Sequence, residues 1–288
     1  MDSFITAGLI GISLGSQYAL LALGFTLIFG ILGVVNFAHG GFYVMGGYVA
    51  YYCTIVLGLP YPVGLLIALI STVALGWLFE VFVLERVIDD HQATLMVTIG
   101  FNLVIATAIL LIFGALSPEF PFPISGVWRK GDIYIPYANM VVLAVCLVAI
   151  VAVYWLVYRT NVGCAMRAMA EDRAVASALG MRTKALFPFA FALATGLAGV
   201  TGGLVTPILA LSPHIGDSVL AFSFITVILG GLGSVTGATV AAFVVGLVDS
   251  YAAVYLGGSK GALTLFLLVL IILVVRPQGL FGKEARRS

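Results

Sequence analysis

Few residues in this chain of 288 residues match a pattern that carries covalent catalysis. Residues 11–15 read Gly-Ile-Ser-Leu-Gly and match the G-x-S-x-G turn that exposes the serine nucleophile of hydrolases. That turn needs a strand before it, a helix after it, and a His with an acidic partner. Here the motif lies in an apolar stretch, and Gly11 and Gly15 have the spacing of closely packed membrane helices. We therefore expect helix packing, as we do for Gly199 and Gly203, and no catalytic residue.

The sequence also lacks the motifs that bind nucleotides and metal ions. No G-x-x-x-x-G-K-[ST] phosphate-binding loop occurs, and residues 257–261 lack the final Ser or Thr of such a loop. The three histidines and three cysteines are dispersed, without the spacing of a metal site or a disulfide framework. We expect no metal, no cofactor and no ATP hydrolysis by this chain, which is therefore predicted not to be an enzyme.

Polar groups within apolar stretches are better candidates, because such groups are costly in lipid unless they line a cavity or find partners. Asn36, His39 and Gly40 lie in the segment NFAHGG, whose glycines let the backbone unwind as it does in transporter substrate sites. An equally good interpretation makes Asn36 a helix cap and bonds His39 to a carbonyl. A second interruption is predicted in the glycine-rich residues 230–237.

Three further polar residues are candidates for a translocation path. Gln17 and Thr226 lie within apolar stretches. Asp249 is the most deeply placed carboxylate. An intramembrane carboxylate serves as a proton or substrate site, or bonds to a neighbouring Ser or Tyr near a helix end, and both interpretations stay open for Asp249.

The longest polar segment, residues 159–184, interrupts the apolar sequence and is patterned like a folded surface. Asp172 is a good N-cap for a short helix to Leu179, and Gly180 stands where a left-handed C-terminal cap is expected. A structured basic segment in a membrane protein indicates contact with a partner on the cytoplasmic side. Its basic residues are Arg159, Arg167, Arg173, Arg182 and Lys184.

The elements that must position these residues are membrane helices. The chain is 62% hydrophobic and only 9% charged, against about 25% charged in soluble domains. Continuous apolar runs, rather than alternation, predict an all-α polytopic membrane protein of about eight to nine transmembrane or half-membrane helices. The first run is too long for a signal peptide and is expected to be a retained span. The predicted segments are 4–29, 37–57, 62–84, 93–116, 138–158, 185–210, 218–232, 236–256 and 261–275.

Basic residues are distributed unevenly between the two predicted sides of the membrane. One side receives Arg86, the basic residues of 159–184, and Arg276, Lys283, Arg286 and Arg287. The other receives Arg129, Lys130 and Lys260. The positive-inside rule therefore places the N-terminus outside and the C-terminus in the cytoplasm.

The largest predicted external segment, 117–137, contains four prolines, which favour a shaped loop over a helix. It is interpreted either as a cap over the helices or as a docking surface for an external partner. The candidate contacts for such a partner are Glu119, Arg129, Lys130 and Asp132.

Taken together in order, these segments resemble the permease subunits of branched-chain amino-acid (LivH-type) ABC importers. The resemblance covers nearly the whole length. Two positions depart from the family's pattern: Phe222 stands where many members carry Lys, and Thr236 where Pro is usual in a Gly-Ser-x-Pro-Gly turn. Phe222 thereby joins the candidate pathway residues, and the exact substrate is left open. The matching residues are 15–20, 36–40, 167–172 with Ala176 and 179–180, 229–233 with Ser234 and Gly237, and 276–280.

The resemblance implies a single permease domain over 1–288 in the inner (plasma) membrane, with 159–184 as a cytoplasmic coupling loop. It implies a second permease subunit, LivM-like or an identical copy, two ATP-binding subunits, a periplasmic substrate-binding protein, and no nucleic acid. The short helix of the coupling loop would dock in a groove of the ATPase; its alternative is a helix on the lipid surface. The implied coupling residues are Arg167, Glu171, Asp172, Val175, Leu179 and Gly180, with Ala178 and Arg173 beside them.

The sequence leaves three functional hypotheses to be tested. The first is a non-catalytic translocation subunit of an ABC importer for branched-chain or related small amino acids, with relatives of the family that carry urea, amides or aromatic acids as alternatives. The second is a self-sufficient secondary transporter or channel, for which Asp249 and His39 are the candidate ion-coupling residues. The third is an intramembrane hydrolase that uses Ser13.

Overall fold

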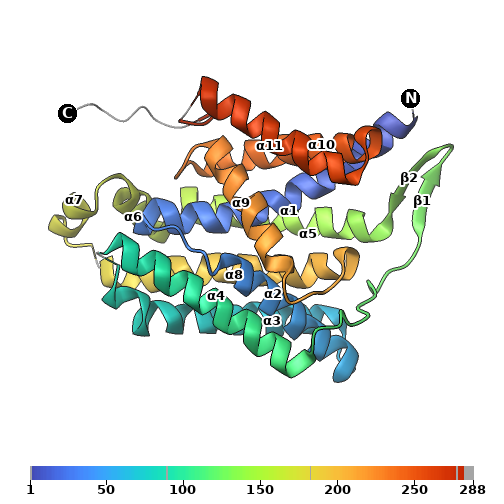
Figure 1. Ribbon diagram of the computed structural model, residues 1–288. Coiled ribbons are helices and arrows are strands. Elements are labelled where there is room, and N and C mark those ends of the chain that lie inside the picture. The colour runs from blue at the N-terminus through green and yellow to red at the C-terminus, as the bar shows by residue number, and fades with distance from the viewer. Residues whose placement is uncertain (1, 89, 182, 277, 282–288) are drawn as a thin grey trace. The chain divides into compact units, whose positions relative to one another are not determined.

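The computed structural model describes residues 2–88, 90–181, 183–276 and 278–281, and most of them are helical. Arg182, Lys283, Arg286 and Arg287 lie outside the described residues, and so do the side chains of Arg173, Lys184 and Lys260. The helices are α1 Asp2–Leu32, α2 His39–Tyr51, α3 Tyr61–Phe82, α4 His91–Phe113, α5 Tyr137–Arg159, α6 Asn161–Glu171, α7 Arg173–Ala178, α8 Thr183–Leu209, α9 Ile215–Gly230, α10 Val235–Leu256 and α11 Gly258–Val275 (Figure 1). A π-helical turn, η1, covers Tyr52–Val56, and a 3₁₀ turn, η2, covers Leu84–Arg86.

The predicted all-α membrane architecture is confirmed. Within the described residues, α1, α3 with η2, α4, α5, α8 and α10 are long and apolar enough to cross a membrane. The other three predicted segments coincide with α2, α9 and α11. Of these, α2 has 13 residues and α9 has 16, so both are shorter than a full span.

One small sheet lies in the proline-containing segment 117–137, where a loop is predicted. Strands β1 (Val127–Lys130) and β2 (Ile133–Pro136) pair antiparallel, with Lys130 opposite Ile133. Gly131 has a φ of 65°, the left-handed conformation that a two-residue hairpin turn requires. The segment is a shaped connection without a helix, as expected, but the hairpin is not anticipated from the sequence.

The chain forms two compact units. The first unit comprises Met1–Thr26, Phe122–Ile150 and Phe222–Ser288. The second comprises Leu27–Pro121 and Val151–Ala221. The chain passes from one unit to the other within α1, α5 and α9, and between Pro121 and Phe122 in the connection before β1.

Close packing of α1 on α10 organises the first unit. A Cβ at Gly15 would lie 2.8 Å from the Cα of Phe243, and one at Gly11 would lie 3.0 Å from the Cα of Leu247. The predicted role of this glycine pair in helix packing is confirmed. Ser13, between them, donates a hydrogen bond to the backbone carbonyl of Asn139 at 3.0 Å. It therefore serves helix association in a setting without the strand that a nucleophile elbow needs.

The second unit is built around α2, which contacts α3, α4 and α8, while α3 also packs on α8 (Figure 1). Gly199 lies against Thr72 of α3, and Gly203 lies against Leu65 and Ala50, so this second glycine pair also serves helix packing as predicted. A hydrogen bond from the Thr195 hydroxyl to the carbonyl of Thr72, 3.1 Å long, joins α8 to α3. Small residues thus let the backbones approach, as is usual between membrane helices.

The predicted interruption at residues 230–237 is confirmed in the first unit. Helix α9 ends at Gly230, and α10 begins after Ser234, whose hydroxyl accepts a hydrogen bond from the Gly237 amide at 3.1 Å. The backbone amide of Leu280 donates to the carbonyl of Leu229 at 2.7 Å. The C-terminal segment therefore satisfies an α9 carbonyl that the helix itself leaves without a partner.

Candidate functional site

The polar segment 159–184 folds into two short helices, α6 and α7, in the second unit. Thr160 caps α6: its hydroxyl accepts a hydrogen bond from the Gly163 amide at 3.0 Å. Gly163, Met166 and Met169 recur every three residues and are buried, so they form one apolar stripe. Sequence reasoning missed this helix, although the Thr160 cap and the spacing of the stripe were visible.

Helix α7 has the caps that the sequence predicts. The carboxylate of Asp172 accepts a hydrogen bond from the Val175 amide at 3.0 Å, as an N-cap does. Gly180 has a φ of 82°, and its amide donates to the carbonyl of Ser177. The next amide, of Met181, reaches back to Ala176, which completes a Schellman motif. The helix ends at Ala178, one residue before the predicted Leu179.

Two apolar side chains, one on α7 and one directly after its last residue, are exposed. Val175 is 54% exposed and Leu179 is 73% exposed, whereas Ala176 is buried against the protein. The two exposed residues are four apart, so they share one face of the helix. The two exposed apolar residues follow the exposed, charged Glu171 and Asp172 in the chain.

Charged residues surround this apolar pair. Glu171 and Asp172 are exposed between α6 and α7. Arg167 is exposed on α6, and its guanidinium lies 5.3 Å from the ring centroid of Tyr158, in a cation–π contact that orients it. We call α6, α7 and the residues through Gly180 the α6–α7 element.

Removing the Asp172 side chain is expected to loosen α7. Because Asp172→Ala deletes the N-cap, the local free energy of opening should fall by about 1 kcal/mol. Hydrogen exchange at the Val175 amide measures this change, and it should quicken about fivefold. Asp172→Asn is the matched control, since Asn caps equally well and should leave exchange near the wild-type rate. Equal exchange in Asp172→Ala and wild type would contradict the capping role.

Three of the polar-path candidates, Gln17, Phe222 and Thr226, belong to the first unit. Gln17 is buried, and the Thr226 hydroxyl donates to the carbonyl of Phe222 at 2.7 Å. The Phe222 ring stacks on Tyr18, with centroids 5.4 Å apart. The Tyr18 hydroxyl in turn donates to the carboxylate of Asp249 at 2.9 Å. Asp249 is therefore bonded to a neighbouring Tyr, one of the two interpretations that the sequence left open.

The other three, Asn36, His39 and Gly40, lie in the second unit at the start of α2. The side-chain oxygen of Asn36 accepts from the Ala38 amide at 3.0 Å, which orders the turn before the helix. Asn36 Nδ2 is buried and has no hydrogen-bond partner among the described residues. His39 is fully buried as the first residue of α2, and Gly40 packs on the backbone of Gly216. Ala38, and not Asn36, is the N-cap of α2, and no side chain caps this helix. The predicted capping role of Asn36 is therefore wrong, since its oxygen bonds an amide that precedes the helix.

Glu80 is a polar group whose setting the sequence did not reveal. It lies near the end of α3 and is fully buried. Within the described part of the chain, neither of its carboxyl oxygens has a hydrogen-bond partner. An ionisable residue within an apolar run is costly in lipid unless it finds partners, and the sequence did not show that Glu80 is enclosed by protein.

Comparison with known proteins identifies the family of this chain. The profile described as branched-chain amino acid transport system, permease component, matches residues 9–275. The chain belongs to this family. It is thus a non-catalytic, multi-pass membrane permease of the ABC transporter type, which works with other components of a transport system.

Named relatives agree with this assignment. The permease is 29% identical over 288 residues to the high-affinity branched-chain amino acid transport system permease protein LivH of Salmonella typhimurium, covering 95% of this chain and 94% of that protein. It is 26% identical to the corresponding protein BraD of Pseudomonas aeruginosa, with the same two shares of coverage. It is also 26% identical to LivM of Escherichia coli K12, over 91% of this chain and 67% of that protein.

Proposed function

We propose that this permease is a translocation subunit of an ATP-driven importer for branched-chain or related small amino acids. Membership of the permease family over residues 9–275 carries this proposal. The full-length similarity to LivH and BraD, which are named as branched-chain amino acid permeases, supports the substrate class. Because the sequence contains no phosphate-binding loop, the ATP that drives this importer is proposed to be hydrolysed by a partner.

The proposed complex lies in the plasma (inner) membrane. It pairs this chain with a second permease subunit, either LivM-like or an identical copy, and with two ATP-binding subunits. A periplasmic binding protein delivers the substrate. Similarity to both LivH and LivM supports the pairing, since two related folds form a pseudo-symmetric pair readily. The N-terminus is proposed to be outside and the C-terminus in the cytoplasm, from the distribution of basic residues.

Energy is proposed to enter through the α6–α7 element. Val175 and Leu179 present an exposed apolar face that fits a groove on the ATPase. Arg167, Glu171 and Asp172 supply charges at its rim, where they set orientation more than affinity. The two capped ends of α7 make the element rigid enough to transmit movement.

The transport step is proposed to be alternating access. ATP binding in the partner moves the α6–α7 element and favours one arrangement of the helices by a few kcal/mol of differential contact. Gln17, Asn36, His39, Gly40, Phe222 and Thr226 are the proposed pathway residues.

ATP dependence of uptake separates this proposal from a secondary transporter. Cells that express the permease with its partner proteins should accumulate radiolabelled leucine. Accumulation should stop when the phosphate-binding Lys of the ATPase is replaced by Ala. Continued uptake with the inactive ATPase would identify a self-sufficient transporter and overturn the proposal.

Glu171→Arg and Gly180→Val are each expected to abolish uptake while leaving the permease in the membrane. The first reverses a rim charge, and the second forces a β-branched residue into the left-handed backbone of Gly180. Transport falls by at least about tenfold for each, measured as initial uptake at equal permease levels. Unchanged uptake at those levels contradicts the docking role.

The substrate is best tested on the periplasmic binding protein that acts with this permease. Calorimetric titration with leucine, isoleucine and valine should give binding, and urea, amides and aromatic acids should give none. If the protein binds only urea, an amide or an aromatic acid, the proposed substrate class is wrong and the permease belongs to another branch of the family.

A further inference from the structure

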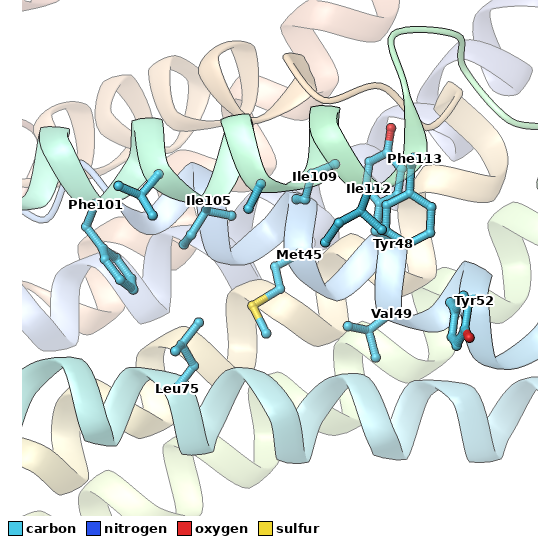
Figure 2. Close-up of a pocket in the computed structure, with 12 residues that line it drawn as sticks. Met45, Tyr48, Val49, Tyr52, Leu75, Phe101, Ile105, Ile109, Ile112 and Phe113 are labelled. Atoms are coloured by element: carbon cyan, nitrogen blue, oxygen red, sulfur yellow. The ribbon is translucent and has the colours of Figure 1, made fainter.

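The apolar groove between α2, α3 and α4 in the second unit does not by itself select an occupant (Figure 2). It is lined by Met45 and Val49 of α2, Leu75 of α3, and Ile105 and Ile109 of α4. Contacts with apolar side chains have no direction, so this lining does not distinguish a lipid chain from the face of a helix. The β1–β2 hairpin of the first unit differs, because it carries backbone groups and charges that set conditions on a partner.

The hydrogen-bond pattern of the hairpin turns part of β1 away from β2. Hydrogen-bonded and non-hydrogen-bonded residue pairs alternate along two antiparallel strands. The Tyr137 amide donates to the Gly126 carbonyl at 3.1 Å, so this pair, directly outside the two strands, is a hydrogen-bonded one. Val127, opposite Pro136, therefore belongs to a non-hydrogen-bonded pair, and so does Arg129 two residues further on. The amides and carbonyls of Val127 and Arg129 consequently point away from β2.

The two edges of the hairpin differ in what covers them. On the β2 edge, the Tyr134 amide donates to the Thr6 hydroxyl of α1 at 3.5 Å, and Pro136 has no amide to offer. On the β1 edge, all four residues are exposed. The described part of the chain offers no hydrogen-bond partner to the outward amides and carbonyls of Val127 and Arg129. Strand β1 is therefore an open edge, to which a further strand can add.

The open edge is basic. Arg129 and Lys130 are exposed, and neither forms an ion pair with another described residue. Asp132, in the turn, is the one acidic residue of the hairpin. A strand that adds to β1 therefore meets a net positive charge, which favours acidic side chains on that strand.

The same charges disfavour a second copy of this chain as the occupant. Its own β1 would bring another Arg129 and Lys130 to the joined edges, and like charges on neighbouring strands are destabilising. Lysines on edge strands commonly prevent such self-pairing. The edge is thus unfavourable for an identical strand and favourable for an acidic one.

A peptide satisfies this edge more completely than a lipid headgroup does. An ionised phosphate accepts hydrogen bonds and donates none, so it would leave the outward carbonyls unpaired. An extended peptide offers both amides and carbonyls in the order that the edge needs. Val127 and Tyr134 are each 48% exposed and lie on the same face as Arg129, and Tyr and Arg are enriched where proteins meet.

We propose that β1 is a docking edge for an extended, acidic segment of the periplasmic binding protein. The segment adds to β1 as a third strand and pairs with the amides and carbonyls of Val127 and Arg129. Its acidic side chains lie beside Arg129 and Lys130. The inference rests on the proposed function, which places the hairpin outside the membrane and supplies the protein that carries the segment.

A photo-crosslinking amino acid at Val127 tests the edge. The membranes contain the full-length permease with its partners and an excess of the periplasmic binding protein. Illumination should give an adduct with the binding protein, at an extended segment that carries Asp or Glu. The same amino acid at Val274, an exposed residue of the first unit on the predicted cytoplasmic side, should give none. Adducts with lipid or with a second permease chain alone, or no adduct, would overturn the site.

ATP-dependent leucine uptake in the same membranes separates this inference from the proposed function. If uptake is intact and Val127 gives no adduct with the binding protein, the docking edge is wrong and the proposed function stands. Uptake that continues with the inactive ATPase would overturn the proposed function, whatever the crosslinking shows.

Val127→Pro removes one outward amide and tests the strand addition itself. The hairpin keeps its own hydrogen bonds, because the Val127 amide points away from β2 and Pro136 already stands opposite. The binding protein should bind the folded permease complex about fivefold more weakly, as the loss of one hydrogen bond predicts. Val127→Ala, which keeps the amide, is the matched control and should stay within about twofold of wild type.

Arg129→Glu tests the charge of the edge. Binding should weaken at least about tenfold, and more at low salt, because an acidic segment would then face a like charge. Arg86→Glu makes the same change at an exposed residue on the predicted cytoplasmic side and should have no effect. Equal weakening by the two variants would overturn the site. Weakening by Arg129→Glu without any by Val127→Pro would show a charged contact without an added strand, and would overturn it too.

Discussion

Replacing Val175 and Leu179 together by Asp is expected to abolish substrate uptake and the recovery of the ATP-binding subunits with the permease. Both residues are exposed and share one face of α7, so the change should not disturb the fold. In a partner's groove, the two carboxylates would be buried without counter-charges. Losing an apolar contact at the centre of an interface costs about 2–4 kcal/mol, and 1.4 kcal/mol is a tenfold change in affinity. We expect at least a hundredfold weaker association.

The matched control for this variant is Ser177→Asp, which adds a charge to the same helix. Ser177 is exposed and lies two residues from Val175, on a different face of α7. Association and uptake should remain within about twofold of wild type. Equal losses in Ser177→Asp and the double variant would show sensitivity to charge on α7, and would remove the argument for an apolar contact.

Replacing Gly202 by Val is expected to destabilise the folded permease. A Cβ at Gly202 would overlap the backbone of Tyr43, and α2 lies at the centre of the second unit. Because the obstacle is backbone, it cannot be relieved by a change of rotamer. Overpacking of this kind costs about 1–3 kcal/mol or more, enough to lower the thermal midpoint by several degrees. The measurement is the melting of detergent-solubilised permease, followed by size-exclusion chromatography.

Gly100→Val is the control for that experiment. Gly100 is also inside a helix, α4, but nothing lies within 4 Å of the place where its Cβ would be. Its midpoint should stay within a degree or two of wild type. A similar midpoint for Gly202→Val and Gly100→Val would mean that α2 and α8 do not depend on their close approach.

Local signals in the sequence were sufficient to predict most of the apolar helices and the two caps of α7. Asp172 and Gly180 cap α7 through backbone groups only a few residues away. Their capping roles could therefore be predicted from the sequence without tertiary structure. Close helix packing at Gly11 and Gly15, and at Gly199 and Gly203, could also be predicted, because membrane helices need small residues where they cross. The family resemblance also rests on local signals, because each of its motifs spans only a few residues.

Features that depend on packing were not predicted. The apolar run 37–57 was continuous in sequence, yet α2 is short and ends in a π-helical turn before Gly58, whose φ is 67°. Glu80 gave no sign in the sequence that it would be buried. Helix α6 was not predicted because its segment was interpreted from its basic charge. The regular spacing of Gly163, Met166 and Met169 was not used.

The central claim is that energy enters this permease from an ATP-binding partner at the α6–α7 element. A photo-crosslinking amino acid at Leu179 tests it in membranes that contain the whole transport system. Because the reaction does not use thiols, the exposed native Cys164 does not interfere. Illumination should produce one covalent adduct with the ATP-binding subunit, and the same amino acid at Leu116, an exposed residue outside the element, should produce none. Adducts at Leu179 with lipid alone, or none at all, would contradict the account.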